Sequence, residues 1–216
     1  MSLGPFARRA TLPITLWVQA ASSAAVIAPT VAAPKLLERA ELGATGVGLY
    51  IALVYLAAMF ASPLGAQVVR RLGPIRSSQV ALLCSALGLG LLALPSLAAG
   101  TLGALLIGLG YGPITPASSQ MLARTTEPRH FSLVFSIKQT GVPLGGVIAG
   151  LMVPGLLGWQ GIAAALGGTA ALCLIGALSA QPLARELDLD RDPASPWPRL
   201  AAVLAPVRFV AADTAL

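Results

Sequence analysis

The sequence predicts an all-α integral membrane protein with six transmembrane helices. Asp, Glu, Lys and Arg are absent from four stretches of 25, 28, 47 and 46 residues: 10–34, 42–69, 77–123 and 139–184. A transmembrane helix needs about 20 apolar residues, so the two shorter stretches hold one helix each and the longer ones hold two each. The composition agrees, because 56% of the 216 residues are apolar and only 10% are charged, against about 25% charged in soluble proteins.

The first two stretches predict helices over residues 12–33 and 45–68. Arg8 and Arg9 precede the first helix, as they would in a signal peptide. A signal core has about 7–15 apolar residues, and this stretch has 25. We therefore interpret it as an uncleaved first helix.

The two longer stretches predict two helices each, over residues 78–98, 101–122, 132–155 and 161–181. Six helices suit a pair of inverted three-helix repeats, an arrangement found in many transporters. A short echo supports this pattern, since Pro-Leu-Gly occurs at residues 63–65 and again at 143–145, in helices two and five of the expected repeat. Residues 1–181 are thus expected to form one bundle. Residues 182–216 are expected to form a cytoplasmic linker and the start of a missing second half.

Basic residues alternate between the loops. Eleven of the 14 fall on one side of the expected bundle: Arg8, Arg9, Arg70, Arg71, Arg76, Arg124, Arg129, Arg185, Arg191, Arg199 and Arg208. The positive-inside rule then places both termini in the cytoplasm, with the protein in the cytoplasmic (inner) membrane. This distribution also explains the net charge of +6 without any nucleic-acid partner.

Lys138 is the one cation that falls well inside an expected helix. Intramembrane ionisable groups are costly and mark functional sites. One reading is a cavity cation that attracts an anionic solute or exchanges charge with a proton-coupled carboxylate. The other is a side chain that reaches back to the headgroups.

Two expected helices carry polar stripes at helical spacing. Gln19, Ser22 and Ser23 lie on helix one, and Tyr111, Thr115 and Ser118 on helix four. Such stripes line a solute cavity, or they form hydrogen bonds between helices worth about 0.6 kcal/mol each. We favour the cavity.

Small residues predict close helix packing in the fifth helix. Gly141, Gly145 and Gly146 are spaced as in small-xxx-small motifs, and Pro143 bends the helix. The two cysteines, Cys84 and Cys173, lie in separate helices and indicate neither a disulfide framework nor a metal site.

The turn after helix two resembles the signature loop of the major facilitator superfamily, a G-x-L-A-D-R-x-G-R-R pattern. Gly73 aligns with the second family glycine, Arg71 with the family arginine, and Arg76 supplies the downstream charge. The first family glycine falls on Ala66, beside Gly65, and the family aspartate falls on Arg70. Residues 141–146 (Gly-Val-Pro-Leu-Gly-Gly) likewise resemble the G-P-x-x-G-G element of exporters in that superfamily.

The resemblance implies a twelve-helix fold of two six-helix halves, alternating access, and a site lined by helices one, four, seven and ten. This chain resembles the N-terminal half. The implied partners are the lipid bilayer, a small solute, and either the missing half or a second copy of this chain.

Two other classes were weighed. A membrane-embedded enzyme needs a nucleophile with a base, or a cluster of metal ligands, and no acidic residue or histidine falls in an expected helix. The sequence therefore predicts no enzyme, metal or cofactor. A complete six-helix permease or exporter that works as a dimer stays open as an alternative.

Overall fold

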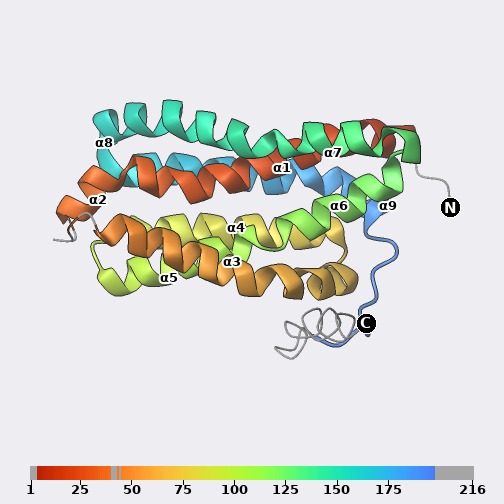
Figure 1. The fold of residues 1–216 in the computed structure, drawn as a ribbon, viewed down its shortest axis with the longest axis horizontal. Helices are drawn as coiled ribbons and strands as arrows, with labels where there is room; N and C mark the ends of the chain where they lie inside the picture. The colour runs from red at the N-terminus through yellow and green to blue at the C-terminus, as the bar shows by residue number, and fades with distance from the viewer. Residues whose placement is uncertain (1–3, 40–42, 44, 198–216) are drawn as a thin grey trace, which may run out of the picture.

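The computed structural model describes residues 4–39, 43 and 45–197, and this part of the chain contains helices and no strand. The longer helices lie side by side in one bundle, with α2 at one end and α9 at the other (Figure 1). Two single 3₁₀ turns cover Pro128–His130 and Gln181–Leu183. The α-helices are α1 (Pro5–Val31), α2 (Ala33–Arg39), α3 (Thr45–Leu72), α4 (Pro74–Leu92), α5 (Leu97–Tyr111), α6 (Ile114–Thr125), α7 (Phe131–Gln139), α8 (Gly141–Ala180) and α9 (Ala184–Leu187).

Five segments of the described chain are long and apolar enough to cross a membrane: Pro5–Val31, Thr45–Leu72, Pro74–Leu92, Leu97–Thr125 and Pro128–Leu187. The all-α membrane architecture is thus confirmed. The last segment is 60 residues long and is broken at Gly161, whose φ of 77° and ψ of −163° are not helical. The two arms of α8 on either side of this glycine run in opposite directions (Figure 1). Six crossings and the inverted repeat stay predictions.

Prolines interrupt two of the expected helices. The expected helix over residues 101–122 is divided into α5 and α6 at Pro113. The expected helix over residues 132–155 is divided into α7 and α8 at Thr140, three residues before Pro143. A proline has no N–H to donate to the carbonyl four residues earlier, so the helix bends or restarts there. Pro143 itself is exposed, in the first turn of α8.

Helix α5 is wedged between α3 and α4 through its glycines. A methyl group at Gly108 would lie 2.2 Å from the Val54 carbonyl oxygen, and one at Gly110 would lie 2.3 Å from that of Ala81. No real side chain fits at such distances, so these backbones touch directly. The close approach follows from the small residues that membrane helices use at their interfaces.

The expected start of a second half, towards residue 216, lies outside the described residues. The described part of the expected linker, residues 182–197, packs against the bundle.

Candidate solute-binding site

Lys138 is buried in the bundle, three residues before Gly141, which meets the middle of α1. It lies in the last turn of α7, which packs against α1, and only 2% of it is exposed. It makes no hydrogen bond and no ion pair within the described part of the chain. A buried cation without a partner is unfavourable, so this position calls for a counter-charge.

A polar stripe follows α1 through the same region. Thr11, Thr15, Gln19, Ser22 and Ser23 are each at most 2% exposed. The two threonines donate to carbonyl oxygens of their own helix, at 2.6 and 2.9 Å. Gln19 Oε1 and Ser22 Oγ have no hydrogen-bond partner among the described residues, and Ser23 Oγ has none with good geometry, although the Tyr111 hydroxyl lies close to it. Buried polar groups are nearly always satisfied, so three orphaned oxygens in one stripe indicate room for a polar ligand or water.

The first arm of α8 lies directly on this stripe because two glycines permit it. A methyl group at Gly141 would lie 2.8 Å from the Leu16 carbonyl oxygen and 2.9 Å from Gln19 Cβ. One at Gly145 would lie 2.6 Å from Ser23 Cβ. Lys138 precedes Gly141 by three residues, in α7, which also packs against α1. The structure thus brings the cation and the orphaned oxygens into one region.

The expected fourth helix (residues 101–122, observed as α5 and α6) contributes one of its three expected residues to this region. The half-buried Tyr111 hydroxyl lies beside Ser23, and its ring meets Tyr55 edge-on at 6.4 Å between centroids. Ser118 is buried, but its hydroxyl donates to Ile114 and Thr115 of its own helix, at 2.8 and 3.1 Å. Thr115 is exposed. Tyr55 was missed by the sequence analysis, because a tyrosine among the apolar residues of a membrane helix carries no signal of its own.

The remaining expected packing residues differ in their surroundings. A methyl group at Gly146 would make only ordinary contact, with Ile27 Cδ1 at 3.4 Å. Gly65 is tight, since a methyl group there would lie 2.9 Å from Pro113 Cα. Of the four residues expected to pack helix five, only Gly141 and Gly145 lie tightly against a neighbouring backbone.

The expected signature loop is mostly helical, because α3 extends to Leu72 and α4 begins at Pro74. Arg70 and Arg71 lie in the last turn of α3, Arg76 in the first turn of α4, and only Gly73 lies between the two helices. Gly73 adopts a positive φ of 90°, a conformation that favours glycine, and it precedes the first residue of α4. The Arg70 carbonyl, the Arg71 side chain and the Arg76 N–H all contact residues 188–197. These loop residues lie at the α9 end of the bundle, away from the pocket at the α2 end.

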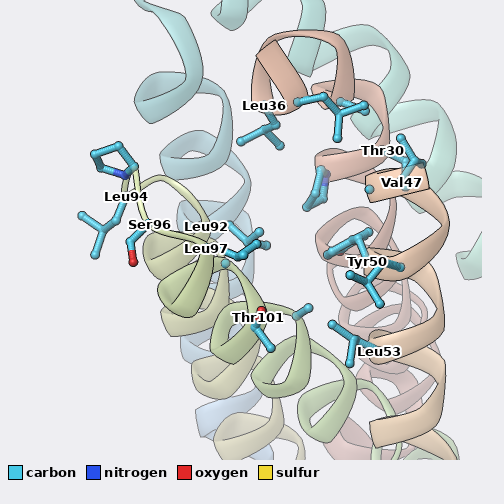
Figure 2. Close-up of a pocket in the computed structure, with 18 residues that line it drawn as sticks. Thr30, Leu36, Val47, Tyr50, Leu53, Leu92, Leu94, Ser96, Leu97 and Thr101 are labelled. Carbon is cyan, nitrogen blue, oxygen red and sulfur yellow. The ribbon is translucent and has the colours of Figure 1, made fainter. Parts of the chain in front are cut away.

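A pocket of about 280 Å³ opens at the α2 end. Figure 2 shows Tyr50 and Leu53 of α3 on one side and Leu92, Leu97 and Thr101 on the other. The lining is mostly apolar. The Tyr50 hydroxyl, at its edge, donates to the Val26 carbonyl at 3.0 Å. This pocket is not lined by the residues expected to contact solute, which are Lys138, Gln19, Ser22, Ser23, Tyr111, Thr115 and Ser118.

No cluster of three or more His, Cys, Asp or Glu suited to a metal ion occurs among the described residues.

Comparison with known proteins points to one family. The family model described as "Major Facilitator Superfamily" matches residues 15–213. A peptide transporter POT, solved in complex with sulfate, has a TM-score of 0.68 and 22% identity over 99% of this chain and 46% of its own. A mutant of that transporter has a TM-score of 0.67 and 23% identity, over 94% of this chain and 45% of its own. At this identity the likeness is one of fold.

The chain thus spans less than half the length of these solved structures. No match is found among the curated proteins. The family model by itself covers residues 15–213, which is most of the sequence. The chain therefore belongs to the Major Facilitator Superfamily.

Proposed function

We propose that this chain is half of a secondary active transporter, which moves a small solute across the membrane by alternating access. Lys138 carries the proposal, because it is a buried cation that has no partner among the described residues. The orphaned oxygens of Gln19, Ser22 and Ser23 lie in the same region. Together they offer one positive charge and several short hydrogen-bonding groups.

An anionic solute fits this region best. Burying an unpaired ammonium group is costly, and the acidic side chains of the described residues lie outside the expected helices. A bound anion would supply the missing counter-charge, and the Ser22 and Ser23 hydroxyls would then donate to its oxygens. A proton-coupled carboxylate in a partner unit is the second candidate for that role, and it would make transport depend on a proton gradient.

The solute path requires a second helical unit. The solved relatives of this fold are about twice as long, and α3 exposes large apolar side chains such as Leu56, Met59 and Phe60. We propose that the rest of the same polypeptide, or a second copy of this chain, supplies the other wall. If a second copy of this chain supplies that wall, the protein is the dimeric six-helix permease of the alternative hypothesis.

The α9 end is proposed to face the cytoplasm of an inner-membrane protein. Arg8, Arg70, Arg76, Arg124 and Arg185 all belong to segments at this end of the bundle (Figure 1), and the positive-inside rule places such loops in the cytoplasm. Export rather than import is favoured only by the resemblance of residues 141–146 to an exporter motif.

The test is uptake by full-length protein reconstituted in liposomes, with a panel of lactate, succinate, glutamate, glucose and lysine. We expect an anion to be transported, and Lys138→Ala to lower that uptake by about 100-fold, the value of a lost charge-assisted contact. Lys35→Ala is the matched control, because Lys35 is an exposed lysine of α2. Lys138→Arg should retain part of the uptake.

Unchanged anion uptake by Lys138→Ala would remove Lys138 from the solute site. Selective uptake of glucose or lysine would contradict an anionic solute. Uptake that needs an imposed proton gradient would identify proton coupling.

A further inference from the structure

The chain that follows α8 is tied to the ends of several other helices. We call residues 181–197 the strap; they include α9. Leu183 and Leu187 of the strap are fully buried. The sequence here reads Glu-Leu-Asp-Leu-Asp-Arg-Asp at residues 186–192, so acidic side chains recur at every second position.

Three of these acidic side chains each bind a different helix end. The Gly4 N–H, at the start of α1, donates to Glu186 Oε2 at 2.7 Å. Asp188 accepts hydrogen bonds from the Ile75 N–H at 2.8 Å and the Arg76 N–H at 3.2 Å, in the first turn of α4. Asp190 pairs with Arg124, in the last turn of α6, at 2.7 Å.

The end of α3 is held by the same strap. The Asp192 N–H donates to the Arg70 carbonyl at 2.9 Å. Arg71 stacks on the Trp197 ring, 4.4 Å from its centroid, and donates to the Ser195 carbonyl. The ends of four helices, α1, α3, α4 and α6, are thus joined through one segment.

Asp188 is the most deeply placed of these contacts. It is only 4% exposed, and a methyl group at Gly73 would lie 2.4 Å from its carboxyl carbon. Helix α4 has no side-chain cap and no acidic residue in its first turn. Its first N–H groups lack partners within the helix and favour negative charge nearby. Asp188 supplies both the acceptor and the charge.

The charges of the turn and the strap are complementary. Arg70, Arg71 and Arg76 make the α3–α4 turn basic without any acidic residue. The strap brings Asp188 to that turn from a position 112 residues later in the chain. The acidic group of this turn therefore comes from the strap.

We propose that the strap is an intramolecular clamp and that Asp188 is a positioning residue for transport. Its carboxylate fixes the start of α4, and the strap makes the ends of α1, α3, α4 and α6 move as one body. The effect on transport rests on the proposed function. The docking of the strap does not, and it is measured separately.

Trypsin cleavage after Arg185 and Arg191 measures this docking. Both arginines are exposed, but trypsin cuts only when several residues of the strap around them leave the bundle. In full-length protein in detergent, we expect Asp188→Ala to raise the cleavage rate about tenfold, as expected for loss of two buried hydrogen bonds. Leu189→Ala is the matched control, because Leu189 lies in the strap next to Asp188 but is 55% exposed and binds no described helix end, and it should change the rate less than about twofold. Equal rates for the two variants would overturn the clamp.

Asp188→Asn covers the case in which Asp188→Ala fails to fold. The amide keeps one acceptor oxygen, but its NH₂ group replaces the other, so one of the two N–H groups of α4 loses its acceptor. We therefore expect about a threefold increase in cleavage. No increase in this folded variant would equally overturn the clamp.

Transport then tests the positioning role. Asp188→Asn should lower the maximal rate with little change in KM, since Lys138 makes no hydrogen bond or ion pair with the described strap residues. Asp188→Glu should restore part of the rate. A wild-type rate in Asp188→Asn would overturn the positioning role. Lys138→Ala should leave cleavage after Arg185 unchanged, so failure of the solute site and failure of the clamp are distinguishable.

Discussion

One buried charged residue lies in the centre of the bundle and another in the strap at its α9 end, but only the one in the strap has hydrogen-bond partners among the described residues. Lys138 is 2% exposed and has no partner in the described part of the chain. Asp188 is 4% exposed and accepts two backbone hydrogen bonds beside Arg76. Both residues are about equally buried, so burial alone does not separate a binding group from a structural one.

The difference lies in what satisfies each charge. The strap satisfies its buried carboxylate from within the chain, which stabilises one arrangement of helix ends. The centre leaves a cation and three oxygens unsatisfied, which costs stability. A region that sacrifices stability in this way is a candidate for function.

Replacing Lys138 by methionine tests this contrast most strongly. Transport should fall by about 100-fold, while the free energy of unfolding should rise by about 1–3 kcal/mol, because an unpaired buried cation is removed. Uptake by liposomes and thermal unfolding in detergent measure the two effects. A loss of both activity and stability would mean that Lys138 has a structural partner.

Adding a methyl group where α8 meets α1 should disturb the centre by packing alone. Gly145→Ala places a carbon 2.4 Å from the Ala20 carbonyl oxygen, so the helices must separate, at a cost of about 1–3 kcal/mol. Gly150→Ala is the matched control, since nothing lies within 4 Å of that position. If both variants unfold at the same temperature, the close contact of α8 with α1 is not required.

Removing the Asp188 carboxylate should destabilise the α9 end. For Asp188→Ala we expect a loss of about 1–2 kcal/mol in the free energy of unfolding, because two N–H groups of α4 lose their acceptor. Chemical denaturation monitored by tryptophan fluorescence measures it. A variant as stable as the wild type would show that water replaces the carboxylate at no cost.

The smallest expected effect is a dependence of stability on pH. Burial raises the pKa of Asp188 above its ordinary 3.8, although the N–H groups of Ile75 and Arg76 and the charges of Arg76 and Arg124 lower it. A raised folded-state pKa means that the folded protein binds the proton more tightly than the unfolded chain. This contribution to stability is complete below the unfolded pKa and is lost as the pH rises through the folded one.

Acidification from neutral pH should therefore stabilise the folded protein through Asp188. The measurement is the melting temperature between pH 7 and pH 5, compared between wild type and Asp188→Asn, which cannot titrate there. The wild type should gain more on acidification than the variant. A gain that is the same in both would assign the pH dependence to other groups.

Much of the fold could be predicted from the sequence, because the bilayer requires long uncharged helices. The charge-free stretches located every apolar span of the described chain, and the loop from Gly65 to Arg76 indicated the family. The helix breaks at Pro113 and Thr140 were not predicted, since a proline in a membrane helix either bends or divides it according to its neighbours. The expected linker gave no sign of its docking, because hydrogen bonds to Ile75 and Arg76 join residues more than 100 positions apart.

The sequence by itself determined that Lys138 lies deep in an apolar segment and that α1 carries a polar stripe. Only the tertiary structure decided that Gln19, Ser22 and Ser23 keep unsatisfied oxygens, that Ser118 is satisfied by its own helix, and that Thr115 is exposed. It also decided that Asp188, and not a residue of the basic turn, holds the start of α4. The reason is physical: helical spacing fixes which residues share a face, but the packing of other helices decides which of those faces find partners.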